Sequence, residues 1–140
     1  MKDRLFLDTN IVLDLLGERK PYYNSIAKIA TLADKRKLRL MVSALSYSTI
    51  FYLLAKVEKK ESVKEKLRKF KIISETSDLT DKIIEKALSS NFKYFEDALQ
   101  YHCALSANCN ILITRNVKDF IQSELPVMTA KEYLNKLKIN

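Results

Sequence analysis

Glycine and proline are scarce in this sequence, which has one glycine and two prolines among its 140 residues. Flexible linkers and low-complexity tracts are rich in such residues, and many tight hairpin turns need them. Their scarcity excludes a linker between domains and favours a helix-rich fold. Because 47% of the residues are hydrophobic, the chain can bury a proper core, and we expect one domain that spans residues 1–140.

Long apolar runs and soft metal ligands are also lacking. No apolar run approaches the roughly 20 residues that cross a bilayer. The short apolar stretch after residue 4 runs directly into Asp8, which is unlike a signal peptide. One histidine with Cys103 and Cys109 is too small a set for a structural zinc site, so we expect two reduced, mostly buried thiols. These absences predict a cytoplasmic protein without membrane contact.

Basic residues outnumber acidic ones by 25 to 17, which gives a formal net charge of +8. An excess of this size favours a polyanionic partner such as a nucleic acid. Basic runs at residues 35–37 and 64–71 can equally be the solvated faces of helices. The charge therefore suggests a polyanionic partner without identifying it.

Short apolar or β-prone segments alternate with segments of helical periodicity. The predicted strands are residues 5–7, 38–42, 72–73, 111–113 and 127–128. Helical patterns fill the intervals, at residues 10–16, 21–34, 50–57, 61–70, 79–88, 94–107 and 129–137. Strands separated by helices imply parallel β-α-β crossovers. We therefore predict an α/β fold whose central parallel sheet is covered by helices on both faces.

Several polar residues are suited to begin helices. Asn10 can cap the first helix, and either Ser43 or Ser46 can cap the helix after the second strand. Thr129 and Glu132, three residues apart, have the spacing of a capping box before the last helix. These residues set the predicted helix boundaries.

Polar side chains follow the predicted strands at the point where each strand ends. In open parallel sheets, functional sites form beyond the carboxyl ends of the strands, where loops and helix N-termini converge. The residues there are Asp8 and Asn10 after the first strand, Ser43 after the second, and Thr114, Asn116 and Asp119 after residues 111–113. Glu96 and Asp97 lie in the first turn of the helix before that strand. Three separate segments are therefore predicted to bring carboxylates to one edge of the sheet.

Carboxylates gathered in this way require a cation. Two bare carboxylates about 4 Å apart repel by roughly 4 kcal/mol at an effective dielectric of about 20. A divalent ion removes this repulsion, and all-oxygen ligands select Mg²⁺ or Mn²⁺, which can orient a phosphodiester and activate water. We therefore predict a nuclease site whose catalytic acids and metal ligands are Asp8, Asp97 and Asp119, with Glu96 as a further metal ligand.

Each of these residues also has a purely structural interpretation. Asp8 can be a helix cap, and Asp97 can complement a helix dipole. Asp119 can cap a short turn, and Asn116 can supply a turn residue. The joint placement of these residues on one predicted edge is what favours the functional interpretation, and it depends on the order of the strands.

Four segments, FLDTNIVLDLL, VSALSYSTIFYLL, FEDALQYHCAL and ILITRNVKDF, occur in that order along nearly the whole chain. They resemble the motifs of PIN domains, in particular a bacterial and archaeal branch related to the VapC-like toxins of toxin–antitoxin pairs. The resemblance implies a three-layer α/β/α sandwich around a parallel sheet and a metal-dependent ribonuclease site. Carried over by position, the family acids fall on Asp8, Asp97 and Asp119, and the accompanying polar positions on Asn10, Thr114 and Asn116.

The chain departs from the family pattern in one respect. Most PIN nucleases have a glutamate on the helix after the second strand, whereas residues 46–50 here contain no carboxylate. Glu58 lies two to three turns further along and is too distant to replace it. Glu96 can compensate only in part, because adjacent helical residues diverge by about 100 degrees.

These observations leave three hypotheses for function. The leading one is a metal-dependent endoribonuclease that acts on RNA, and the resemblance is compatible with a small antitoxin partner and with a homodimer. A haloacid-dehalogenase-like phosphatase would need a second aspartate where this chain has Asn10. The third is a non-catalytic RNA-binding or regulatory domain that lacks one acidic ligand.

Overall fold

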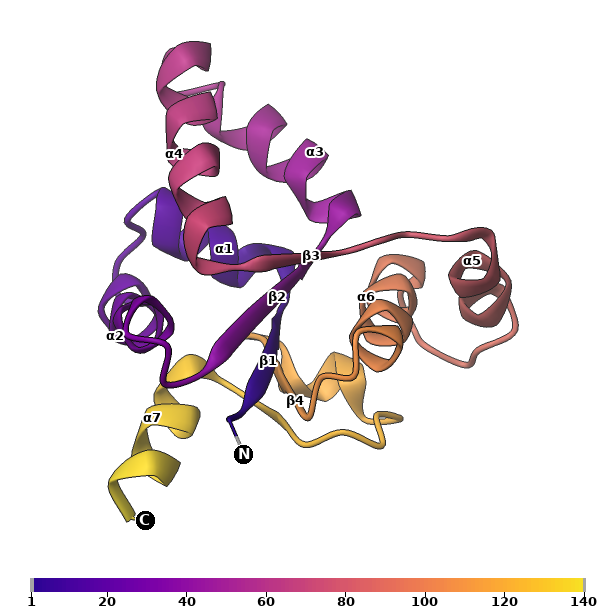
Figure 1. Ribbon diagram of the computed structural model, residues 1–140. Helices are drawn as coiled ribbons and strands as arrows, with labels where there is room; N and C mark the ends of the chain where they lie inside the picture. The colour runs from indigo at the N-terminus through magenta and orange to yellow at the C-terminus, as the bar shows by residue number, and fades with distance from the viewer. Residues whose placement is uncertain (1, 140) are drawn as a thin grey trace.

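A wholly parallel sheet forms the centre of the protein, as a computed structural model that describes residues 2–139 shows (Figure 1). Its strands within these residues are β1 (Arg4–Leu7), β2 (Arg39–Ser43), β3 (Glu75–Ser77), β4 (Ile111–Ile113) and β5 (Val127–Met128). They lie in the order β3-β2-β1-β4-β5. The first strand of the chain is therefore the central strand, between β2 and β4.

The side chains of β1 explain why it lies in the centre. Leu5, Phe6 and Leu7 are fully buried. Because successive strand residues point to opposite faces, Leu5 and Leu7 join the core on one face and Phe6 joins the core on the other. A strand that is apolar on both faces is stable only where both faces are covered.

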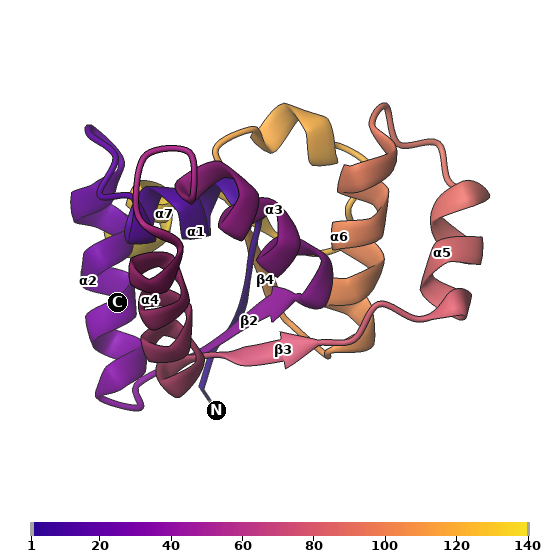
Figure 2. The same cartoon turned by 90° about the horizontal axis from the view of Figure 1, so that it is seen from above.

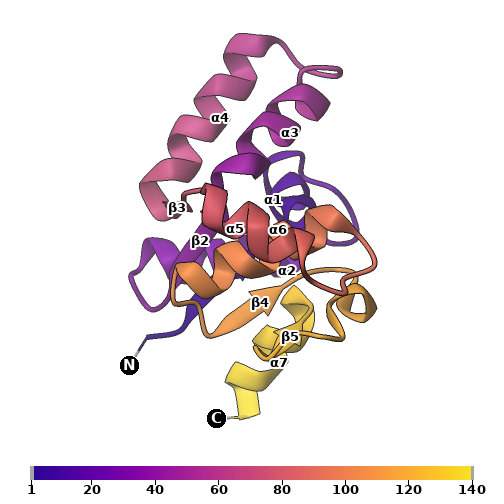
Figure 3. The same cartoon turned by 90° about the vertical axis from the view of Figure 1, so that its right-hand side faces the viewer.

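Helices cover both faces, so the predicted three-layer α/β/α architecture is confirmed (Figure 2). The Leu5 face packs against α1 (Thr9–Leu16), α2 (Tyr23–Asp34), α3 (Ala44–Leu54), α4 (Lys60–Ile73) and α7 (Ala130–Ile139). The Phe6 face packs against α5 (Asp81–Leu88), α6 (Phe95–Ser106) and the 3₁₀ turn Val117–Phe120. Figure 3 shows α3 and α4 extending together beyond the sheet.

Several of the predicted boundaries were wrong. Residues 72–73 are the end of α4 and not a strand, and the third strand begins only at Glu75. Ile72 is 82% exposed whereas Ile73 packs against the core, as expected for neighbours that diverge by about 100 degrees around a helix. The first helix is capped by Asp8 rather than by Asn10, and α2 begins at Tyr23 rather than at Pro21.

Other predicted features are confirmed. Ser43 caps α3, because its hydroxyl accepts a hydrogen bond of 3.1 Å from Leu45 N. Thr129 and Glu132 form the capping box of α7, with reciprocal hydrogen bonds of 2.9 and 3.1 Å. Both cysteines are buried free thiols. Across residues 2–139, none of the helices is both long and apolar enough to cross a membrane.

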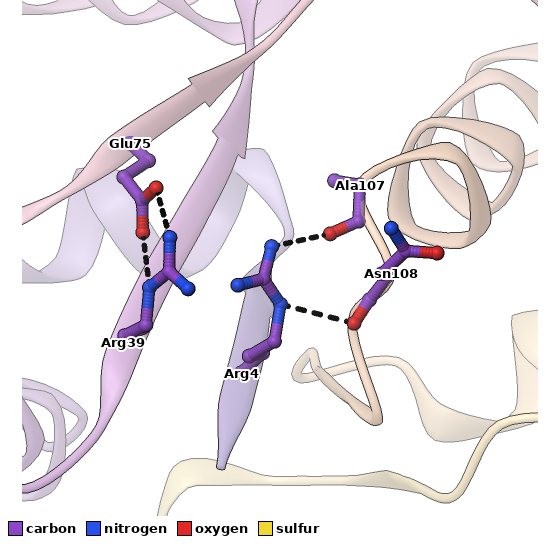
Figure 4. A network of polar contacts seen from close by, with 5 residues as sticks. All are labelled: Arg4, Arg39, Glu75, Ala107 and Asn108. Atoms are coloured by element: carbon purple, nitrogen blue, oxygen red, sulfur yellow. Dashed lines mark hydrogen bonds and ion pairs between the residues drawn. The ribbon is translucent and has the colours of Figure 1, made fainter. Parts of the chain in front are cut away.

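The amino edge of the sheet is held by arginines (Figure 4). Arg4 donates hydrogen bonds of 2.7 and 3.1 Å to the carbonyls of Ala107 and Asn108, where α6 ends. A cation there complements the negative end of the helix dipole. Arg39 on β2 pairs with Glu75 on β3 at the same edge. The opposite, carboxyl edge is the one that carries the acidic residues.

Candidate active site

The acidic site begins at the point where the strand order reverses. The chain proceeds from β1 to β2 and β3 on one side, and β4 and β5 lie on the other side of β1. Ligand sites in open parallel sheets form beyond such a switch point. Asp8 directly follows β1, and its backbone N–H donates to Ile113 O at 3.0 Å, so the ends of β1 and β4 are joined.

Asp8 is a buried carboxylate that also caps α1. It is 6% exposed, and it accepts hydrogen bonds from Thr9 N at 2.9 Å and from Thr114 Oγ1 at 2.8 Å. Burial is the largest cause that raises the pKa of Asp8, and the hydrogen bonds from Thr114 and Thr9 oppose that rise. The charges of Glu96 and Asp119 raise the pKa of Asp8 further. The capping interpretation is therefore correct, but Asp8 also faces other carboxylates.

Asp97 is repelled by all three of the other predicted acids. Burial is the largest cause that raises the pKa of Asp97 to about 7. The charges of three other carboxylates add to the shift, in the order Asp8, Asp119 and Glu96. The four predicted acids, from three separate segments, therefore lie near one another at the carboxyl edge, where the charges of Glu96 and Asp119 add to the rise that burial causes in the pKa values of Asp8 and Asp97. We call these four residues the acidic cluster.

The acidic cluster does not form a closed set of metal ligands. Among residues 2–139, no three side chains of the metal-binding types lie at the spacing of a complete ligand set. The donor chemistry nevertheless fits a hard divalent cation. Each Asp8 oxygen accepts one hydrogen bond and can accept a second interaction. Mg²⁺ commonly binds through one or two carboxylates and keeps several waters, so a closed cage is not required.

Two of the predicted polar residues support Asp8 and Asp119. The Thr114 hydroxyl is fully buried, donates to Asp8, and accepts a hydrogen bond of 3.1 Å from Asn116 N. The Asn116 carbonyl in turn accepts a hydrogen bond of 2.9 Å from Asp119 N. One short chain of hydrogen bonds therefore runs from Asp8 through Thr114 to the turn that carries Asp119.

The other two predicted polar residues are less directly involved. Ser43 is buried and caps α3, and its hydroxyl lies 3.6 Å from Cys103 Sγ rather than against a carboxylate. Asn10 lies in the first turn of α1, two residues after Asp8. Among residues 2–139 its side chain, which is partly buried, forms no hydrogen bond with Asp8 or the other acids.

A buried neutral network beside the acidic cluster was not predicted. Thr9 Oγ1 and Ser46 Oγ lie 2.7 Å apart, and Gln100 Nε2 donates to both, at 2.7 and 3.0 Å. All three residues are buried, and Gln100 Oε1 has no hydrogen-bond partner among the described residues. Gln100 lies three residues after Asp97, on the same side of α6, and this spacing was the available signal. Hydroxyl and amide groups thus occupy the start of α3, where the sequence lacks the family glutamate.

Comparisons with known proteins identify the family of the chain. A family model described as "PIN domain" matches residues 4–118. Ribonuclease VapC1 from Aquifex aeolicus (strain VF5) is 28% identical over 138 residues, which cover 96% of this chain and 95% of that protein.

Solved structures share the fold. The structure of VapBC2 from Rickettsia felis, bound to a DNA fragment from the promoter, matches with a TM-score of 0.64 at 21% identity, over 89% of this chain and 96% of that chain. VapC20 from Mycobacterium tuberculosis, described as a sarcin-ricin loop cleaving toxin, matches with a TM-score of 0.61 at 13% identity, over 77% of this chain and 86% of that chain. At these identities the likeness concerns the fold alone.

Proposed function

Because the chain belongs to the PIN domain family, we propose that it is a metal-dependent endoribonuclease. The acidic cluster of Asp8, Glu96, Asp97 and Asp119 would hold Mg²⁺ or Mn²⁺. The single observation that carries this proposal is the placement of Asp8, whose buried carboxylate is fixed by Thr9 N and Thr114 Oγ1 at the carboxyl end of the central strand. Burial is the largest cause that raises the pKa of Asp97 to about 7, and the charges of Asp8, Asp119 and Glu96 add to the shift. Such repulsion is unfavourable for the fold alone, and a divalent cation would remove it.

Each residue has a role that follows from its contacts. Asp8 is fixed by Thr9 N and Thr114 Oγ1, which hold its carboxylate at the end of β1. Asp97 comes from α6 and Asp119 from the turn after β4, and both would bind the ion beside Asp8. When bound, the ion supplies Lewis-acid activation of water and of the phosphodiester. The two hydrogen bonds that Asp8 accepts would keep its carboxylate aligned with the ion.

The binding-only alternative is less well supported. An acidic cluster repels the phosphates of RNA unless cations neutralise it, so a domain that only bound RNA would gain nothing from four carboxylates at this edge. The relative from Aquifex aeolicus, which matches nearly the full chain, carries the name ribonuclease. The phosphatase alternative is excluded because the chain matches the PIN family model.

A toxin role extends the proposal. The VapBC2 structure from Rickettsia felis and the VapBC-1 structure from Haemophilus influenzae resemble this chain in fold. We therefore propose that this chain is the toxin of a toxin–antitoxin pair, restrained by a small antitoxin protein. Production of the chain alone should stop the growth of a bacterial host, and Asp97→Asn should remove that effect. Normal growth with the wild-type chain would count against the toxin role.

Cleavage of RNA provides the direct test of the activity. Wild-type protein should cut single-stranded RNA with Mn²⁺ or Mg²⁺ and should stop when a chelator is added. Asp97→Asn should be inactive, whereas Asp34→Asn, the same change at an exposed position at the end of α2, should cut as wild type does. Equal cleavage by wild type and Asp97→Asn would mean that another site or a contaminant is responsible.

A further inference from the structure

A cavity lies beside the segment that joins Thr114 to Asp119. It has a volume of about 390 Å³, and its lining includes Ile11, Pro21, Tyr22, Arg115, Asn116 and Lys131. Asn116 links the cavity to the cluster, because it lines the cavity and its N donates to Thr114 Oγ1, which donates to Asp8. Its volume lies within the range of roughly 300–1,000 Å³ that is usual for pockets that bind small molecules.

Arg115 is held in this cavity by two contacts. Its Nε lies 3.0 Å from Oδ2 of Asp14, a carboxylate that is fully buried on α1. Its guanidinium carbon lies 4.2 Å from the centre of the Tyr22 ring. The two carboxylate oxygens of Asp14 form no hydrogen bond within the described residues. The charge of Asp14 is therefore balanced mainly by Arg115, and Arg19 forms a second ion pair with it at 3.9 Å. A buried countercharge and a stacked ring together pre-organise the guanidinium.

The outer part of the guanidinium remains available. The ion pair with Asp14 is made through Nε, the Arg115 side chain is 27% exposed, and no residue in 2–139 accepts a hydrogen bond from its two Nη groups. Paired Nη groups of this kind match the oxygens of a phosphate. Lys131 adds a second cation, in the first turn of the ten-residue helix α7, where the helix dipole also favours an anion.

We propose that this cavity is a nucleotide subsite for the RNA substrate. Arg115 and Lys131 would bind a phosphate that neighbours the scissile one, and the apolar wall of Ile11, Pro21 and Tyr22 would contact the attached nucleoside. The inference rests on the proposed ribonuclease function. It also resolves an electrostatic problem, since the acidic cluster repels RNA and the substrate needs cationic contacts close by.

The test measures RNA affinity in the Asp8→Asn protein, which is expected to bind RNA without cutting it. A labelled single-stranded RNA is titrated by fluorescence anisotropy in Mg²⁺ at several salt concentrations. Adding Lys131→Gln should weaken binding about five-fold. It should also make the negative slope of log K against log salt shallower by about 0.7, the value for one phosphate contact on a single strand. Lys138→Gln, the same change on an exposed residue in the last turn of the same helix, is the control and should change neither quantity.

Arg115 is tested in a form that avoids an unpaired buried charge. Arg115→Gln alone would leave Asp14 buried without its partner and could unfold the protein. The double variant Asp14→Asn/Arg115→Gln removes both charges and should also weaken RNA binding, with a thermal melt as the check on folding. Tyr22→Ala, at a position that is 44% exposed, removes part of the apolar wall and should also weaken RNA binding.

The outcomes separate the two proposals. Unchanged RNA affinity in Lys131→Gln and in the folded double variant would overturn the subsite, whatever the cleavage assay gives. Loss of affinity in these variants, together with a wild-type protein that never cuts RNA, would support the subsite and overturn the nuclease function. Absence of RNA binding by every variant would overturn the subsite as well.

Discussion

Thr114 Oγ1 donates a hydrogen bond of 2.8 Å to Asp8 Oδ2, although 106 positions separate the two residues in the sequence. The contact joins the end of β4 to the end of β1 and is fully buried on the side of Thr114. It holds one oxygen of Asp8 while Thr9 N holds the other. The orientation of the central acid therefore depends on two donors, one at the start of α1 and one just after β4.

Replacement of Thr114 by valine removes the hydroxyl and nearly keeps the shape. Asp8 Oδ2 and Asn116 N would then lose a partner in a buried place, which should lower the free energy of unfolding by about 1–3 kcal/mol. Urea denaturation measures this loss. Thr31→Val is the control, at an exposed position of α2 where the hydroxyl donates only to Ala27 O. It should change stability by no more than about 0.5 kcal/mol. Similar effects at both sites would mean that the Asp8 contact contributes little.

Asp8→Asn should abolish metal-dependent RNA cleavage and leave the fold intact. Asparagine still accepts the hydrogen bond from Thr9 N, so the cap of α1 is kept, and loss of the charge relieves repulsion from Glu96 and Asp119. The melting temperature in chelator should therefore stay equal or rise.

Asp8→Ala provides the contrast to that variant. Alanine cannot cap α1 and should cost about 0.5–2 kcal/mol of stability. A marked drop in the melting temperature of Asp8→Asn, as large as that of Asp8→Ala, would contradict the proposed repulsion at this position.

Asp97 makes the stability of the metal-free protein depend on pH. Its pKa is about 7 in the folded protein, mainly because of burial, against an ordinary value of 3.8 for an aspartate side chain. A carboxyl whose folded pKa is raised adds stability at low pH, and this contribution is lost as pH rises through about 7. In chelator, the melting temperature should therefore increase as the pH is lowered from about 8 to about 5.

Two variants and a metal ion check the origin of that pH dependence. Asp97→Asn should flatten the profile, whereas Asp34→Asn should leave it as in wild type. Mn²⁺ should raise the melting temperature most at high pH, where the carboxylates are charged and can bind it. A wild-type profile that is flat in chelator would show that the acidic cluster does not carry the expected repulsion.

RNA binding should weaken steeply as salt increases. The net charge of +8 and the cations beside the acidic cluster imply contacts with phosphates, and each contact releases counterions. A titration of the Asp8→Asn protein with single-stranded RNA at several salt concentrations measures this dependence. Constant affinity between low and moderate salt would show that the basic excess is solvated surface only.

Local patterns in the sequence were sufficient for much of the fold and for the acids. The apolar run of residues 5–7 predicted a strand and the position of Asp8 at its end, because adjacent residues stay adjacent in any fold. Helical periodicity placed Asp97 and Glu96 in the first turn of α6, and the spacing of Thr129 and Glu132 predicted a capping box. Such features depend on contacts within a few residues.

The boundary between α4 and β3 shows where local patterns were insufficient. Ile72 and Ile73 are β-prone and apolar, yet they complete α4, because the preceding helix continues and Ile73 reaches the core from it. Propensity is a weak signal that packing overrides. The true strand, Glu75–Ser77, has two exposed residues and is defined by its pairing with β2 rather than by its composition.

The strand order was decided by the tertiary structure alone. Placing β4 beside β1 brings Thr114 to Asp8 and Arg115 to Asp14, pairs whose members lie about a hundred residues apart in the sequence. The same packing brings Thr9, Ser46 and Gln100 from three helices into one buried network. Strand order depends on how helices share the two faces of the sheet, and no local pattern of residues records it. The sequence by itself therefore determined which acids are present, and the assembly of the sheet determined what surrounds them.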